Sequence, residues 1–166
     1  MDNSPISKGF TLVELIVVII ILAIVSITAV SRMSGRSSFE LYALQDQVIS
    51  VVRQIQLNRM QSNMDMSVSG AESLRLVAAN NCIGSQSACD NTSETRSDVI
   101  ASDDYSFSSV PSSNYSSPIE FSLLGNPENT ASSGVQITIL SNNNSDKAWV
   151  CVNSQGFAYP SNQGCP

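Results

Sequence analysis

FTLVELIVVIIILAIVSITAV, which occupies residues 10–30, is the stretch that decides the fold of this 166-residue chain. The stretch is apolar apart from four positions, which are Thr11, Glu14, Ser26 and Thr28. About 20 predominantly apolar residues are enough to cross a bilayer as an α-helix. Backbone groups in lipid must find their hydrogen bonds within the segment, so the many β-branched residues do not prevent a helix there. We therefore predict a membrane-spanning helix over residues 10–30.

Glu14 is the one charged residue in this stretch. A carboxylate inside a membrane helix costs about 2.5–3.5 kcal/mol on insertion scales. A cost of this size indicates a site with a partner. The alternative is that Glu14 lies near enough to the end of the segment for its carboxylate to reach the lipid headgroups.

Residues 1–9 form a short polar leader that contains Lys8 and Gly9. The leader is too short and too mixed to be a structural element, and it is typical of a processing segment. Lys8 also fits the positive charge expected on the cytoplasmic side of a membrane helix. An ordinary secretory signal cut near Ala29 fits less well, because the apolar region is too long and no clear cleavage pattern precedes Arg32.

Beyond residue 30, apolar residues continue at the spacing of one helix face. They are Phe39, Leu41, Tyr42, Leu44, Val48, Val52 and Ile55. We predict that the helix extends through an amphipathic part over residues 31–62, which packs against a head. Gly35 is the weak point, since glycine costs about 1 kcal/mol inside a helix. A bend or local melting is expected near residues 34–38.

From residue 63 the sequence becomes rich in Ser, Asn, Gly and Thr, with short β-type runs between turn signals. This pattern predicts a β-rich head over residues 63–166. The predicted strands are residues 74–79, 105–110, 119–124, 135–140, 149–152 and 157–159. The segment from Asn80 to Asp104 is predicted to be a long, exposed, Ser-rich excursion outside the core. The fold class is then α+β, with a long N-terminal helix packed on an antiparallel sheet or sandwich.

The head contains all four cysteines of the chain, which are Cys82, Cys89, Cys151 and Cys165. An even number of cysteines behind a membrane-crossing segment fits two disulfides formed in an oxidising compartment. Of the three possible pairings we favour the local one, Cys82 with Cys89 and Cys151 with Cys165. A zinc site fits poorly, because the chain has no His and the cysteines of each pair are too far apart in sequence.

Composition excludes several classes of function. With 14 acidic against 8 basic residues, the chain lacks the basic stripe that nucleic-acid binding requires. Without His, no base is evident for a Ser or Cys nucleophile, and no phosphate-binding or dinucleotide-binding glycine pattern is present. We therefore expect neither an enzyme nor a cofactor, and we interpret the adjacent Asp103 and Asp104 as a solvated turn and not as a calcium site.

Two aromatic residues of the head, Trp149 and Tyr159, could stack on a sugar. A lone Trp in a strand is more often part of the core. We therefore expect Trp149 in the core.

The segment KGFTLVEL, residues 8–15, resembles the signature of the type IV pilin and pseudopilin family. That signature is a short basic leader ending in Gly, followed by Phe, Thr, Leu, an apolar residue and Glu. The resemblance implies that a prepilin peptidase of the inner membrane cuts between Gly9 and Phe10 and methylates the new amino terminus at Phe10. It also implies the type IV pilin fold, in which a β-rich head lies on the second half of a long helix.

The signature has a physical rationale. After cleavage Phe10 carries a free amine, and Glu14 lies four residues further on, beside Thr11 and the start of the apolar stretch. Each charge needs a partner and can serve the other, most usefully between adjacent subunits, so we assign Phe10, Thr11 and Glu14 to assembly. Gly9 allows a protease to approach the backbone closely.

Past the signature the chain is similar to minor pilins and pseudopilins of the GspH and FimT type. The positions that carry this similarity are Leu44, Gln47, Val51, Arg53, Arg59, Ile119, Glu120, Phe121, Gly125, Ile137, Thr138, Ile139, Trp149, Val150, Cys151, Val152 and Gly156. The cysteine-containing head also resembles the MshC-type minor pilins of the mannose-sensitive haemagglutinin pilus. The resemblance implies a structural subunit in the inner membrane of a Gram-negative bacterium, with the pilus assembly platform and other pilins as partners. The alternatives are a pseudopilin of a type II secretion system and an adhesin head displayed on a pilus.

Overall fold

The computed structural model of the chain describes residues 10–33, 36–91, 96–143 and 145–166. The chain divides into two compact units, Met1–Ser37 and Ser38–Pro166. The leader, including Gly9, and the predicted weak point at Gly35 lie outside the described residues.

The first unit contains one described helix, α1, over Leu12–Met33. Every described side chain from Phe10 to Ser26 is exposed, and nearly all of them are apolar. Within the described parts of the chain, no helix combines the length and the apolar character that a membrane crossing needs. The membrane span over residues 10–30 stays a prediction.

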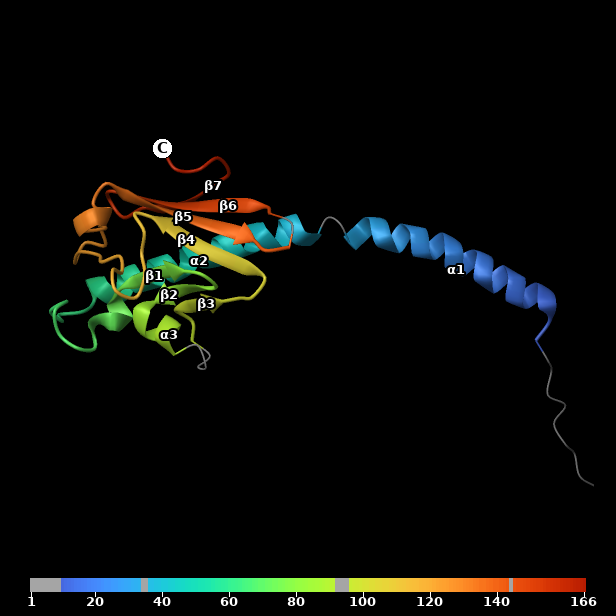
Figure 1. Cartoon of the computed structure of the whole chain (residues 1–166), viewed down its shortest axis with the longest axis horizontal. Helices are drawn as coiled ribbons and strands as arrows, with labels where there is room; N and C mark the ends of the chain where they lie inside the picture. Colours follow the sequence, from blue (N-terminus) through green and yellow to red (C-terminus); the bar gives the residue numbers. More distant parts are fainter. Residues whose placement is uncertain (1–9, 34–35, 92–95, 144) are drawn as a thin grey trace, which may run out of the picture. The chain divides into compact units, whose positions relative to one another are not determined.

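Helix α2, over Arg36–Met60, belongs to the second unit from Ser38 onward (Figure 1). One side of α2 is buried, at positions three or four apart: Leu41, Leu44, Val48, Val52 and Ile55. This spacing is that of one helix face, as predicted. Phe39 and Tyr42 were expected on the same face, but they are 76% and 49% exposed.

Two antiparallel sheets follow α2 in the sequence. The first is formed by β1 (Leu76–Ala79), β2 (Cys82–Ser85) and β3 (Val99–Ala101), in that order. The second is formed by β4 (Tyr105–Val110), β5 (Gly134–Ser141), β6 (Lys147–Asn153) and β7 (Ala158–Ser161), also in chain order. Short helices occur at Ala71–Leu74 (η1), Gln86–Asp90 (α3) and Asn129–Ala131 (η2). The α+β fold class is confirmed.

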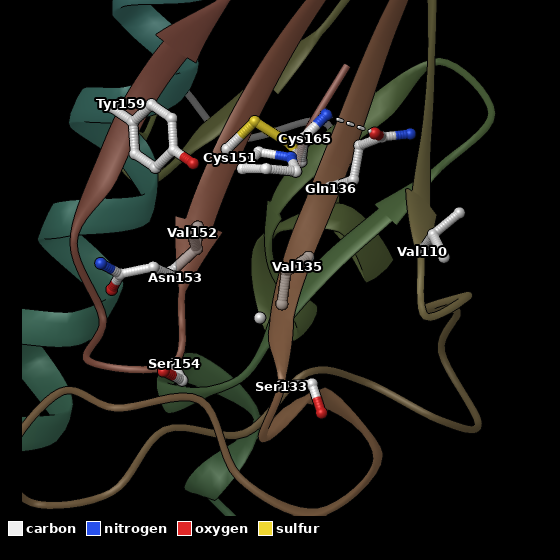
Figure 2. A pocket seen from close by; sticks show the side chains of 12 residues that line it. Val110, Ser133, Val135, Gln136, Cys151, Val152, Asn153, Ser154, Tyr159 and Cys165 are labelled. Carbon is white, nitrogen blue, oxygen red and sulfur yellow. Dashed lines mark hydrogen bonds between the residues drawn. A yellow bond between two sulfur atoms is a disulfide. The ribbon is translucent and has the colours of Figure 1, made fainter.

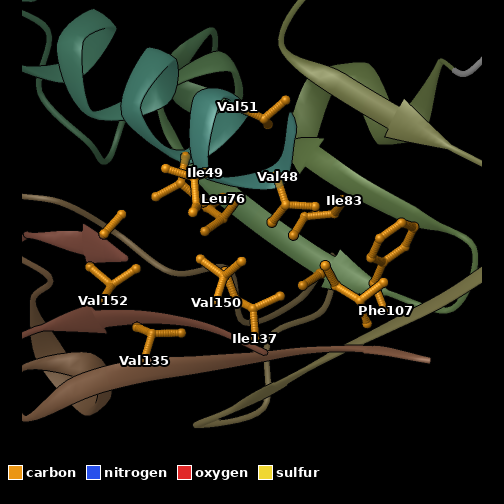
Figure 3. Close-up of a cluster of buried hydrophobic side chains, with 14 of the residues drawn as sticks. Val48, Ile49, Val51, Leu76, Ile83, Phe107, Val135, Ile137, Val150 and Val152 are labelled. Carbon is orange, nitrogen blue, oxygen red and sulfur yellow. The ribbon is translucent and has the colours of Figure 1, made fainter. Parts of the chain in front are cut away.

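The core lies between α2 and the two sheets (Figure 3). Val48 of α2 lies above Leu76 and Ile83 of the first sheet and Ile137 and Val150 of the second, and all five are completely buried. Along β5 and β6, apolar core residues alternate with residues on the other face, as the pleat of a strand requires. The core cluster is drawn entirely from the second unit, so the head has a core of its own.

The predicted strand at residues 119–124 is wrong. This segment pairs through single bridges only, Leu76 with Ile119 and Phe121 with Pro127. Ile119 and Phe121 are buried, but the chain turns at Ser122, whose carbonyl accepts a hydrogen bond from the Gly125 N–H at 3.0 Å. The alternation of apolar and polar residues here therefore indicates which side chains are buried, but the segment does not pair with a neighbouring strand along its length.

The prediction that residues 80–104 lie outside the core is also wrong in part. The segment contains β2, α3 and β3, and Cys82, Ile83, Ala88 and Cys89 are buried. The physical reason is a close approach of two strands: a Cβ on Gly84 would lie 2.5 Å from the carbonyl oxygen of Asp98. Gly84 is thus the residue that lets β3 pack on β2.

Candidate functional site

Thr11 caps the N-terminus of α1. Its hydroxyl oxygen accepts a hydrogen bond from the backbone N–H of Glu14 at 3.2 Å, and its carbonyl accepts one from Leu15 at 3.2 Å. A helix N-terminus has four N–H groups without intrahelical partners, and a threonine hydroxyl at the cap satisfies one of them. The cap fixes the position at which the helix begins, and therefore the position of Glu14.

Glu14 is held in the first turn of α1, where the helix dipole favours a negative charge. The sequence Thr-x-x-Glu from Thr11 to Glu14 is a capping-box pattern. This role for Thr11 was missed in the sequence, although the pattern could have shown it. Glu14 is exposed, and among the described residues no cation forms an ion pair with it.

The structure thus brings Thr11 and Glu14 together at the start of an exposed apolar helix, with Phe10 directly before the cap and 79% exposed. Residues 6–30 match the family model described as the prokaryotic N-terminal methylation motif. The match supports a type IV pilin or pseudopilin precursor. No curated protein and no solved structure matches the chain.

The methylation motif implies a membrane-anchored precursor that is processed by a prepilin peptidase and assembles with other pilins. Pilins are in general structural proteins and not enzymes. The α+β fold, with an N-terminal helix followed by antiparallel sheets, is consistent with the type IV pilin fold. The match ends at Val30, so the head has to be interpreted from its own structure.

In the head, α2 is attached by side-chain amides and guanidinium groups as well as by its apolar face. The Gln56 amide donates to the carbonyl oxygens of Gly125 and Gly156, both at 2.8 Å, and is 6% exposed. Gln45 donates in the same way to the carbonyls of Trp149 and Ser161, at 2.6 and 3.1 Å.

Two arginines extend this pattern along α2. Arg53 donates to the carbonyl of Ala158 at 3.0 Å, and Arg59 donates to that of Phe121 at 3.0 Å. Buried carbonyls without a donor are costly, so these bonds fix β7 and the segment at Phe121 on the helix.

Both local disulfides favoured by the sequence are present in the head. Cys82 is bonded to Cys89 across the β2–α3 connection, and Cys151 is bonded to Cys165, which attaches the C-terminal segment to β6. The Cys165 N–H donates to Oε1 of Gln136 at 2.8 Å, which holds the same segment to β5 (Figure 2).

A hollow of about 340 Å³ opens beside this second disulfide, on the face of the four-stranded sheet that lies opposite the core (Figure 2). Gln136, Asn153 and Tyr159 contribute to its lining, and its lining side chains are uncharged. The core prediction for Trp149 is wrong: Trp149 alternates with the buried Ala148 and Val150 and is half-buried on this outer face, outside the core cluster.

Asp98 of the head is bound by side chains of the same chain. Arg96 donates two hydrogen bonds to Asp98, at 2.9 and 2.8 Å, and Ser85 donates a third at 2.6 Å. The guanidinium of Arg96 beside Asp98 holds the pKa of that carboxyl below its usual value, although burial acts in the opposite direction.

Asp103 and Asp104 lie in a polar turn, as predicted. They accept hydrogen bonds from Asn81 at 3.4 Å and from Asn143 at 3.3 Å. In the described part of the chain no group of three or more His, Cys, Asp or Glu side chains could hold a metal ion.

Proposed function

We propose that the chain is a structural minor pilin that a prepilin peptidase cuts between Gly9 and Phe10, methylates at Phe10 and passes to a type IV pilus of the mannose-sensitive haemagglutinin type. The observation that carries the proposal is the start of α1. There Thr11 positions the carboxylate of Glu14, which has no ion-pair partner among the described residues. The apolar side chains of α1 that the structure describes, up to Val25, are all exposed. A helix that is apolar on every side requires lipid or other protein around it.

The proposed mechanism gives Glu14 two successive environments. In the inner membrane, residues 10–30 span the bilayer and Glu14 lies near one end of the span, where water and headgroups reach it. In the filament, the carboxylate pairs with the methylated amine of Phe10, most usefully that of an adjacent subunit. The pair forms where helices pack, so its formation favours assembly over return to the membrane.

The remaining assignments belong to the same proposal. Residues 1–9 are the removed leader, 31–62 the amphipathic continuation of the helix and 63–166 the displayed head. The partners are the prepilin peptidase, the pilus assembly platform and other pilin subunits. The role is supporting pilus biogenesis and surface attachment, without catalysis, cofactor or nucleic acid.

Substitution of Glu14 tests the proposal. In the native host lacking its own copy, the Glu14→Val chain is expected to insert into the membrane and to be cut after Gly9. Its content in sheared filaments is expected to fall by on the order of 100-fold, because removing one partner of a buried pair costs about 3–5 kcal/mol, and about 1.4 kcal/mol is tenfold. Mass spectrometry of the N-terminal peptide reports processing, and immunoblots of filament and membrane fractions report incorporation.

Glu14→Gln is the matched control for size and shape, and it should fail like Glu14→Val if charge is what matters. Glu14→Asp keeps the charge and should retain part of the incorporation. Normal filament content of the Glu14→Gln chain would disprove the pairing.

Two alternatives from the same motif predict different losses on deletion of the gene. If the chain is a pseudopilin of a type II secretion system, deletion of its gene would abolish export of secreted proteins and leave surface filaments intact. If the head is an adhesin, deletion of the gene would leave filaments intact and abolish attachment. Its ligand would be expected in the hollow beside Tyr159, whose lining side chains are uncharged. Loss of the filaments themselves is the outcome expected from the structural role.

A further inference from the structure

An apolar hollow lies where the C-terminal end of α2 meets two turns of the head. It has a volume of about 240 Å³, and its apolar lining comes from Leu57, Met60 and Leu124, which are 53%, 46% and 77% exposed. Small-molecule sites usually measure about 300–1,000 Å³. The hollow is therefore small for a cofactor and of a size to receive a single large side chain of another protein.

The floor of the hollow is formed by two turns of the head that are held tightly together. The turn at Gly156 touches the turn at Gly125 so closely that a Cβ on Gly156 would lie 2.2 Å from the Gly125 carbonyl oxygen. The Gln56 amide joins both turns by donating to their two carbonyls. A preformed hollow requires little ordering when a side chain enters it.

A complementary protrusion lies at the other end of the same helix. Among the described residues of the head, Leu124 and Phe39 are the two most exposed large apolar side chains, at 77% and 76%. Phe39 precedes Leu57 by about five helical turns, which places the two on the same face of α2, about 27 Å apart. Tyr42, 49% exposed, lies one turn beyond Phe39.

The charges at the two ends are also complementary. Arg53 lines the hollow, is exposed, and forms its hydrogen bond with a backbone carbonyl. Glu40, next to Phe39, is exposed too, and within the described residues neither side chain has an ion-pair partner. An aromatic side chain with a carboxylate beside it therefore matches an apolar hollow with an arginine at its edge.

We propose that the hollow formed by Leu57, Met60 and Leu124 receives Phe39 of a second copy of this chain, with Glu40 of that copy beside Arg53. Because the protrusion and the hollow lie on one face of one helix, two copies that face each other antiparallel can make the contact twice, which closes into a two-fold dimer. The proposal goes beyond the pairing of Glu14, because both surfaces lie on the head.

Cross-linking between two populations tests the contact. Full-length Tyr42→Cys and Leu124→Cys chains are mixed in detergent micelles and treated with a short bismaleimide. The first chain keeps Phe39 and carries its thiol one helical turn away, at an exposed position. The reagent reacts with the introduced thiols because the described cysteines are all in disulfides. A covalent heterodimer is expected. Leu123→Cys is the matched control, because Leu123 is 54% exposed and adjacent in sequence but does not line the hollow, and its yield should stay at that of the chain without an added cysteine.

Charge-reversal variants distinguish this contact from nonspecific association of the chains. Adding Arg53→Glu to the Leu124→Cys chain should lower the yield by tenfold or more, because a like-charge contact is unfavourable. Adding Glu40→Arg to the Tyr42→Cys partner should restore it. Trp149 fluorescence during unfolding confirms that the Arg53→Glu head is folded.

Equal yields from Leu123→Cys and Leu124→Cys, no heterodimer at all, or no effect of the charge reversals would each overturn the proposal. Dimers formed only between two Tyr42→Cys chains would point to a shared detergent or lipid contact and would overturn it as well. The Glu14→Val chain is expected to cross-link normally, so failure of this contact and failure of the Glu14 pairing give different results.

Discussion

The helices α1 and α2 belong to one chain, yet they meet their surroundings in opposite ways. On α1, every described side chain from Phe10 to Ser26 is exposed. On α2, one side is buried in the head, and Gln45, Gln56 and Arg59 are buried with it as donors to backbone carbonyls of strands and loops. The difference shows which contacts the chain makes for itself and which it leaves to other molecules.

The comparison separates stability from assembly. Apolar surface is stabilising only where it is removed from water. For α2 this happens when the head folds, whereas for α1 it requires lipid or other subunits. Substitutions on α2 should therefore alter the unfolding of the head, and substitutions on α1 should alter association with membrane or filament.

The largest difference is expected between two isoleucines. Ile55 of α2 is completely buried, whereas Ile19 of α1 is 55% exposed. Ile55→Ala is expected to lower the free energy of unfolding of the head by about 2–5 kcal/mol, through lost burial and the cavity left behind. Ile19→Ala should change it by less than about 0.5 kcal/mol.

Urea unfolding of the full chain in detergent, followed by fluorescence, measures both variants. Trp149 is the one Trp of the chain and lies in β6, so the signal reports on the head. Similar losses for the two variants would mean that α1 shares the core of the head, and the division between the helices would be wrong.

The sequence predicted the four-stranded sheet well because alternation and burial coincide there. In β5, Ile137 and Ile139 are buried and the residues between them face outward. Residues 119–124 show the same alternation, and Ile119 and Phe121 are buried, but the segment forms only isolated bridges. Alternation reports which side chains are buried, and pairing depends on a partner strand that the local sequence does not describe.

The polar attachment of α2 had no local signal at all. Gln56 donates to residues 69 and 100 positions away, and both acceptors are backbone carbonyls. A glutamine on a helix is ordinarily solvated, so its burial follows from where the turns at Gly125 and Gly156 are placed. That placement is a property of the folded head.

A smaller effect is therefore expected from the amides of α2, where Gln56 and Gln54 form a matched pair. Gln56→Met keeps the length of the side chain but leaves the carbonyls of Gly125 and Gly156 without their donor, which should destabilise the head by about 1–3 kcal/mol. Gln54 donates to the hydroxyl of Ser97 at 2.9 Å in an exposed position, so Gln54→Met should cost less than about 0.5 kcal/mol. The same urea titration measures both, and a Gln54→Met chain as unstable as Gln56→Met would show that burial of the amide is not what matters.

The capping box at the start of α1 was present in the sequence as Thr-x-x-Glu, but the cleavage signature occupies the same residues. The same residues thus form the capping box and part of the cleavage signature. Thr11 fixes the helix start, and Glu14 is both a first-turn acid and the proposed partner of the Phe10 amine. Removing the hydroxyl of Thr11 separates the two roles, because the carboxylate stays.

Thr11→Ala is accordingly expected to give the smallest effect. Loss of the cap should weaken the first turn of α1 by about 1 kcal/mol, which corresponds to roughly fivefold faster hydrogen exchange at the Glu14 amide when that turn opens locally. Thr11→Ser keeps an acceptor and should exchange like the parent chain. Exchange is measured by NMR on the mature chain in detergent micelles. Unchanged protection in Thr11→Ala would show that lipid contacts and not the cap set the start of α1, and Glu14 would then owe its position to its surroundings instead of to its own helix.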